Sequence, residues 1–149
     1  MITYDRLADL AALAGRVIGT SGWVEVDQAR ITQFAQATGD LQWIHVDPAR
    51  AQDGPFGTTI AHGYLTLSLL PSASYEVVPR QGGMAINYGL NKVRFPAPVP
   101  VDSRLRATFE VIDFAEEDWG GQATMRATIE REGGDKPVCV AEIVFRYYR

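Results

Sequence analysis

The sequence has a single cysteine, no excess of positive charge and no long apolar run. With only Cys139, the chain cannot form an internal disulfide, which suits a reducing cytoplasm. The formal net charge is −4 without a long run of one sign, which argues against a nucleic-acid surface. The N-terminal residues lack the pattern of a signal peptide, and no apolar run approaches the roughly 18 residues of a membrane helix. We therefore expect a cytoplasmic protein that binds neither nucleic acid nor membrane.

Several familiar catalytic motifs are absent as well. The sequence has no GxSxG, P-loop or GxGxxG pattern, which argues against a serine hydrolase, an NTPase or a Rossmann oxidoreductase. The residues that could supply metal ligands are Asp40, His45, Asp47 and His62. Without an HExxH or CxxC pattern, we expect no metal site. Cys139 lies in an alternating, strand-like run, so we expect a small core residue rather than a nucleophile.

Length and periodicity predict one domain over residues 1–149 with helices in its first half. Short helices are predicted over residues 4–14, 28–38 and 48–52. Asp27 is placed to cap the second of these helices and Gly39 to end it. The first strand is predicted near Trp23–Val26, after a stretch broken by glycines, and residues 40–60 are otherwise expected to be loop.

The most apolar helical segment runs from His62 to about Tyr75, and its apolar residues cover nearly all sides. Such a helix is expected to be buried. Pro71 removes the hydrogen bond to the Leu67 carbonyl and clashes with it, at a cost of about 3 kcal/mol. We therefore predict a kink or a broken turn between Leu67 and Pro71.

The second half of the chain is predicted to be β-sheet. Strands are expected over residues 84–95, 105–114, 122–132 and 138–148. Apolar and polar residues alternate along the last three, and glycine-rich turns join them, which predicts an antiparallel meander. The predicted fold class is α+β, with a bent antiparallel sheet wrapped around the apolar helix.

Asp40 and His45 are the first candidates for chemistry. Gly39 should end the preceding helix, so a tight loop could turn both side chains to one point. A carboxylate and an imidazole that share a water can move protons near neutral pH. The alternative is that Asp40 caps the loop and His45 packs on Trp43.

The start of the apolar helix is the second candidate. The first N–H groups of a helix have no partner within it, and they could hold a carbonyl oxygen that gains negative charge. Gly63 has no side chain to block a ligand from such an N–H. The alternative is an ordinary helix start with a packed His62.

At these residues the sequence resembles the MaoC-like dehydratase family, the (R)-specific enoyl-CoA hydratases of the hot-dog fold. The segment Gly39–His45 has the family's Gly-Asp pair and its His at the family's spacing. Phe56–Gly63 is similar to the family's second motif, which ends in Ile-x-His-Gly, and Lys92–Val99 resembles a family strand that ends in a Pro-Val step. Gln42 and Trp43 stand where the family usually has Asn and Pro, as in a NodN-like subgroup.

The resemblance implies reversible syn hydration of trans-2-enoyl-CoA to (R)-3-hydroxyacyl-CoA without a cofactor. It implies that Asp40 and His45, on an overhanging loop, are the catalytic pair. The residues expected to form the oxyanion and substrate contacts are Gly63, His62 and Gln42. Candidate contacts for the CoA diphosphate are Arg80, Lys92 and Arg94.

The resemblance further implies a homodimer, with acyl-CoA at the interface and an acyl tunnel beneath the helix near Tyr64, Leu67 and Tyr88. Three alternatives stay open. The chain could be a hot-dog thioesterase, although Glu76 is the first carboxylate along the helix. It could be a non-catalytic acyl-CoA-binding protein, or its substrate could be carried on acyl carrier protein.

Overall fold

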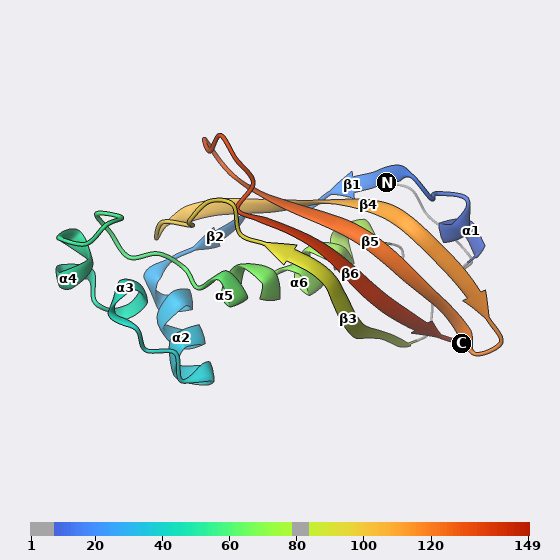
Figure 1. The fold of residues 1–149 in the computed structure, drawn as a ribbon, viewed down its shortest axis with the longest axis horizontal. Helices are drawn as coiled ribbons and strands as arrows, with labels where there is room; N and C mark the ends of the chain where they lie inside the picture. The colour runs from blue at the N-terminus through green and yellow to red at the C-terminus, as the bar shows by residue number, and fades with distance from the viewer. Residues whose placement is uncertain (1–7, 79–83) are drawn as a thin grey trace.

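The computed structural model describes residues 8–78 and 84–149. Its strands are β1 (Arg16–Thr20), β2 (Val24–Val26), β3 (Met84–Arg94), β4 (Ser103–Glu117), β5 (Gly120–Arg131) and β6 (Cys139–Tyr148). Its helices are α1 (Ala8–Ala11), α2 (Gln28–Thr38), α3 (Trp43–Val46), α4 (Pro48–Gln52), α5 (Gly63–Ser68) and α6 (Leu70–Val77). The strands form one six-stranded sheet in the order β1-β4-β5-β6-β3, and β2 also pairs with β4. The sheet curves around α5 and α6 (Figure 1), which confirms the predicted α+β arrangement.

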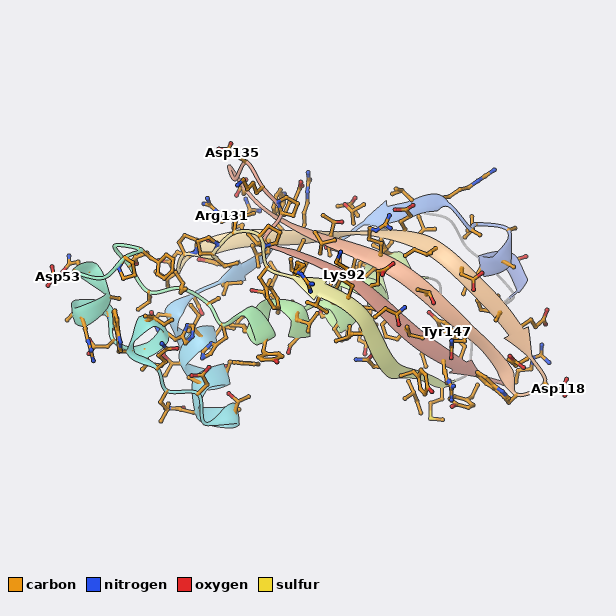
Figure 2. All side chains as sticks on the ribbon, viewed as in Figure 1. Asp53, Lys92, Asp118, Arg131, Asp135 and Tyr147 are labelled. Carbon is orange, nitrogen blue, oxygen red and sulfur yellow. The ribbon has the colours of Figure 1, made fainter. Side chains whose placement is uncertain are left out.

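The C-terminal strands form the predicted antiparallel meander. β4 pairs with β5, and β5 pairs with β6. Their connecting turns, marked by Asp118 and Asp135 in Figure 2, lie at opposite ends of the sheet. From Ser103 to Val111 of β4 every second side chain is buried, and Phe109, opposite Ala127, has no exposed surface. The alternation in the sequence therefore separates a face that packs on the helices from a face that carries polar residues.

The apolar segment predicted as one long helix is two shorter helices, α5 and α6, separated at Leu69. At the break, the Leu69 N–H donates to the Thr66 carbonyl at 3.2 Å. Pro71 lies in the first turn of α6, where its missing N–H would have no helical partner anyway. The predicted break between Leu67 and Pro71 is confirmed, whereas the continuous helix is not found. Within residues 8–78 and 84–149, no helix is long and apolar enough to span a membrane.

Two elements near the N-terminus differ from the prediction. α1 ends at Ala11 rather than at residue 14, and residues 1–7 lie outside the described part of the chain. β1 was not predicted, because its glycine suggested a break. In the structure a Cβ on Gly19 would lie 2.9 Å from Cγ1 of Val77. The missing side chain therefore lets α6 pack closely on β1.

The helices α2, α3 and α4 lie together at one end of the molecule, beyond the strands (Figure 1). We call residues 28–62 the overhang. The predicted helices at 28–38 and 48–52 are confirmed as α2 and α4, and α3 is an additional turn in a region predicted as loop. Asp27 caps α2 by accepting the N–H of Arg30 at 2.8 Å. Gly39 ends α2 with a left-handed φ of 81°, which turns the chain toward the segment that follows.

Cys139 confirms the expectation of a packed core residue. Its side chain has no exposed surface and belongs to the hydrophobic core. Burial raises the pKa of the Cys139 thiol to about 11, so the thiol stays protonated and unreactive near neutral pH.

Replacement of Phe109 by alanine tests the position of the core. Phe109 lies under the helices with no exposed surface, so Phe109→Ala should lower the free energy of unfolding by about 3–5 kcal/mol. The part-exposed Thr128 on β5 provides the control, and Thr128→Ala should change it by less than about 1 kcal/mol. Urea unfolding followed by circular dichroism measures both values. Similar losses in the two variants would contradict the assigned core face.

Candidate active site

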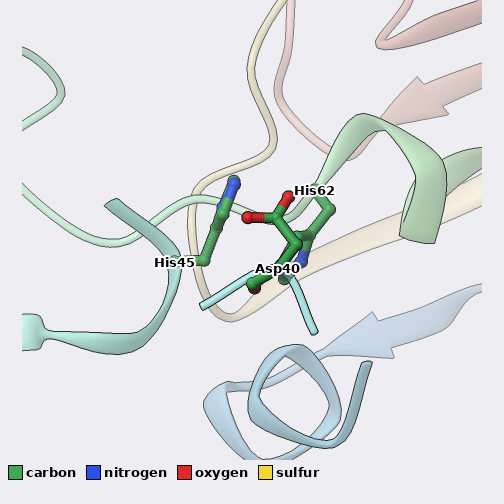
Figure 3. A group of neighbouring side chains, drawn as sticks. All are labelled: Asp40, His45 and His62. Atoms are coloured by element: carbon green, nitrogen blue, oxygen red, sulfur yellow. The ribbon is translucent and has the colours of Figure 1, made fainter. Parts of the chain in front are cut away.

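Asp40, His45 and His62 converge in the structure (Figure 3). One nitrogen of each imidazole and a carboxylate oxygen of Asp40 all lie within 4.8 Å of one another. We call these three residues the polar cluster. Asp40 follows the end of α2, His45 is in α3, and His62 is the N-cap of α5. Asp40 is exposed, whereas His45 and His62 are only 6% and 3% exposed.

A hydrogen bond to the main chain fixes the orientation of His45. Its Nδ1 lies 2.7 Å from the carbonyl oxygen of Ile60. Because a carbonyl oxygen can only accept, Nδ1 is the donor, and the neutral ring carries a lone pair on Nε2. His45 therefore has one nitrogen committed to the scaffold and one available for a proton.

The surroundings of His45 favour its neutral form. Burial lowers the pKa of the His45 imidazole below its usual value of 6.5. The Ile60 carbonyl and the Asp40 carboxylate raise this pKa, the nearby His62 ring lowers it, and the net shift is downward. At neutral pH the ring is thus a proton acceptor, as a general base must be.

His62 is packed inside the overhang. Its ring stacks on His45 with centroids 3.8 Å apart and an interplanar angle of 23°. Phe34 of α2 lies on it at 4.9 Å. Its Nε2 is 3.0 Å from the backbone carbonyl of Asp40. His62 therefore contacts both members of the predicted catalytic pair through the protein interior.

Gly63 begins α5, next to His62. Its N–H finds no acceptor among the described residues, as expected at the start of a helix. The space that a Cβ would occupy faces Phe95, whose ring atoms would be 3.1–3.3 Å away. The glycine therefore has a packing role beside Phe95 in addition to leaving the N–H accessible.

Gln42 lies at the entrance to α3. It is exposed, and its side chain makes no capping hydrogen bond. Its backbone N–H points to Oδ1 of Asp40 at 3.4 Å. Gln42 thus meets the catalytic candidates through its main chain, and its side chain is free to meet a ligand.

Two residues that the sequence analysis missed hold the overhang together. Gln28 of α2 donates through Nε2 to the His45 carbonyl at 2.8 Å and accepts from the Thr59 hydroxyl at 2.6 Å. It therefore joins α2, α3 and the segment that leads to α5. Nothing in the sequence distinguishes Gln28 from an ordinary polar residue in the first turn of a helix, because its partners are 17 and 31 positions away.

Trp43 braces the outer part of the overhang. The Arg50 guanidinium lies over its ring at 4.4 Å from the centroid. A Cβ on Gly54 would lie 2.9 Å from the same ring. The indole therefore joins α3 to α4 and to the turn beyond it, at the position where the family usually has proline.

The cations predicted to contact CoA do not belong to the polar cluster. Lys92 and Arg94 lie on β3 and, together with Arg126 and Glu142, line a groove of about 350 Å³. Figure 2 shows Lys92 on the sheet, away from the end that carries α4 and Asp53. Arg80 lies outside the described residues.

The donor set of the polar cluster suits a water or a divalent metal equally in its chemistry, since it offers two imidazoles and a carboxylate. Each imidazole points one nitrogen at a backbone carbonyl. The groups that remain are the Asp40 carboxylate, Nε2 of His45 and the buried Nδ1 of His62. A water held between Asp40 and His45 Nε2 could be deprotonated there and delivered to an electrophile.

Comparison with known proteins identifies the family. A model of the MaoC like domain family matches residues 9–134. The chain is 56% identical to 3-hydroxyacyl-thioester dehydratase Z of Mycobacterium tuberculosis over 99% of both sequences. It is 43% identical to nodulation protein N of Rhizobium meliloti over 91% of this chain and 86% of that protein.

A solved structure has the same fold. The (R)-hydratase from A. caviae involved in PHA biosynthesis superposes with a TM-score of 0.74 at 27% identity, over 88% of this chain and 96% of that one. This similarity over nearly the whole of both chains confirms the predicted hot-dog fold. With most of its length matched by the family model and by these relatives, the chain belongs to the MaoC-like dehydratase family.

Proposed function

We propose that this protein is an (R)-specific hydratase that adds water reversibly to a trans-2-enoyl thioester and forms the (R)-3-hydroxyacyl product. The observation that carries the proposal is the convergence of Asp40 and His45 with His62, which directly precedes Gly63 at the start of α5. The chain's relatives include named dehydratases, and hydration is the reverse of that reaction. A hydro-lyase activity therefore accounts for both the cluster and the relatives.

The chemistry needs one water, one proton transfer and a place for negative charge. Asp40 and His45 hold the water, whose oxygen bonds to C3 of the enoyl group as the pair takes one of its protons, and the pair returns a proton to C2 on the same face. The electrons of the double bond pass toward the thioester oxygen, which accepts a hydrogen bond from the Gly63 N–H. The carboxylate and the imidazole lie close together and share the work of proton transfer.

An apolar cavity supports an acyl substrate. A cavity of about 230 Å³ lies between the α5–α6 segment and the strands β3 and β6. Leu67, Leu90 and Phe145 are among its lining residues. Of the residues predicted for the tunnel, Leu67 does line this cavity, whereas Tyr64 and Tyr88 are not among its lining residues and are 74% and 57% exposed. Both tyrosines therefore lie outside this cavity, and the Arg146 guanidinium lies over the Tyr88 ring at 3.5 Å from its centroid.

The edge of the sheet supports a homodimer. β3 is the last strand in the order and pairs with β6 only, among the strands that the structure describes. It exposes the apolar side chains of Met84, Ile86 and Leu90. An apolar strand with an open edge favours pairing with another strand, so we infer that two copies join through β3. Lys92 and Arg94 would then lie near this interface, where an anionic CoA or acyl carrier phosphate could bind.

The thioesterase alternative finds less support. Glu76 is the acidic residue on α6, and its carboxylate accepts the Gly22 N–H at 2.7 Å. It is therefore engaged with the connection between β1 and β2, away from the polar cluster. We also propose that the reaction needs no cofactor, because a carboxylate, an imidazole and an N–H suffice for the steps above, and that it takes place in the cytoplasm.

Substitution of the catalytic pair is the direct test. Asp40→Asn and His45→Gln each remove a proton acceptor at nearly constant size, so kcat for hydration of crotonyl-CoA should fall by about 10²–10⁴-fold while circular dichroism stays unchanged. Thr128→Ala, remote from the cluster, should keep wild-type activity. Near wild-type hydration in both variants would refute the proposal, and release of free thiol by the wild type without hydration would favour a thioesterase.

The lowered pKa of His45 gives the protein a defined acid response. Below the usual value of 6.5 the unfolded chain binds a proton at this residue that the folded chain does not bind. The free energy of unfolding should therefore fall as the pH drops through and below 6.5, and less steeply in His45→Gln. The pH at which kcat/KM falls on the acid side of its profile (its acid limb) should also lie below 6.5. Equal pH dependence of unfolding in the two proteins would contradict the assigned cause.

Sedimentation equilibrium tests the dimer. The wild type should have twice the mass of one chain at micromolar concentration. Because Ile86 is 42% exposed on β3, Ile86→Lys should shift the equilibrium toward the monomer through charge repulsion between the paired edges. Thr128→Ala again serves as the control. A monomeric wild type would exclude the proposed interface.

A further inference from the structure

His62 is the residue that links the parts of the polar cluster. Its ring lies against the ring of His45 at 3.8 Å. Its Nε2 faces the backbone carbonyl of Asp40 at 3.0 Å. Its own carbonyl accepts the Thr66 N–H in the first turn of α5, directly before Gly63. The side chain of His62 thus contacts both members of the predicted catalytic pair. Its backbone directly precedes Gly63, the predicted oxyanion donor.

The hydrogen bond of His62 determines its tautomer. Since the Asp40 carbonyl can only accept, Nε2 of His62 must carry the proton. Its other nitrogen, Nδ1, is buried and has no hydrogen-bond partner among the described residues. A lone pair tolerates such a position better than an N–H, because a buried donor without an acceptor loses its bond to water and gains none. In the neutral ring the proton therefore lies on Nε2 and the lone pair on the buried Nδ1.

The stacking of the two rings affects the protonation of His45. Two imidazolium ions face to face at this distance would repel, so the His62 ring disfavours a proton on His45. The remaining titratable group beside His45 is Asp40, and the other neighbours of the rings, Phe34 and the Ile60 carbonyl, carry no charge. His62 consequently affects both where His45 lies and how readily it is protonated.

From these contacts we propose that His62 is a positioning residue of the hydratase, held as the neutral Nε2–H tautomer. It fixes Asp40 by a hydrogen bond and His45 by stacking, and it touches neither the substrate nor the water. The two histidines then have opposite tautomers, Nδ1–H in His45 and Nε2–H in His62. The proposal rests on the proposed function for its kinetic consequences, whereas the tautomers do not depend on it.

Nitrogen-15 NMR of the wild-type protein tests the tautomers without any activity measurement. The chain has only two histidines, so the spectrum of His45→Gln assigns both rings. At about pH 7.5 long-range proton–nitrogen correlations should show a protonated Nδ1 in His45 and a protonated Nε2 in His62. A protonated Nδ1 in His62, or a rapidly exchanging mixture of its tautomers, would overturn the proposal.

Two substitutions separate the two contacts. His62→Phe keeps a stacked ring but loses the hydrogen bond to Asp40, and His62→Gln keeps an N–H donor but loses the ring. Each should lower kcat by about tenfold or more and change KM by less than about threefold, because the catalytic pair is displaced and the substrate is not contacted. The acid limb of kcat/KM should move to higher pH in both variants, since both lack the imidazole whose charge lowers the pKa of His45.

Phe34→Leu is the matched control. It removes a ring from His62 but leaves the contacts of His62 with Asp40 and His45 in place. Its acid limb should therefore stay where the wild-type limb lies. If both His62 variants fold and keep the wild-type kcat and the wild-type acid limb of kcat/KM, the positioning role is overturned. If neither His62 variant folds, the NMR spectrum of the wild type decides the proposal. Failure of the proposed hydratase mechanism itself would be recognised separately, by full activity in Asp40→Asn.

Discussion

The hydrogen bond from His45 Nδ1 to the Ile60 carbonyl is the contact on which the candidate site depends. It joins α3, in the middle of the overhang, to the segment that enters α5. Because it uses the nitrogen farther from the predicted water, it also leaves Nε2 with the lone pair that the chemistry needs. A single bond between a side chain and the main chain thus sets the position, the tautomer and the available nitrogen of the proposed base.

The rest of the overhang supports this bond with polar contacts inside a small volume. Gln28 holds the carbonyl of the same histidine, and Thr59 in turn holds Gln28. The His62 ring stacks on the His45 ring. Buried polar groups are stable only when they are paired, so this network favours one arrangement of α2, α3 and the segment that leads to α5. The sheet with its α5–α6 core provides the rigid base to which the network is attached.

Much of this structure could be predicted from the sequence, and the exceptions have physical causes. The alternation in residues 105–148 predicted the meander, Asp27 and Gly39 predicted the ends of α2, and the effect of Pro71 predicted the break before α6. β1 was missed because Gly19 has a packing function that only the approach of α6 reveals. α3 was missed because a four-residue turn has no periodic pattern and depends on contacts with distant residues.

The residues of the candidate site could be proposed from the sequence, but the contacts between them could not. The family resemblance pointed to Asp40, His45 and Gly63, and in the structure Asp40 and His45 lie together with His62, which directly precedes Gly63. The brace formed by Gln28 and Thr59 and the stacking of His62 join residues that are far apart in sequence, so no local pattern could predict them.

The most direct measurement of the central claim is the stereochemistry of the product formed from crotonyl-CoA in deuterium oxide. If one water held by Asp40 and His45 attacks C3 and the proton is added to C2 on the same face, the product is (R)-3-hydroxybutyryl-CoA, with deuterium at C2 syn to the hydroxyl. An (S) product, anti addition, or no hydration at all would contradict the account.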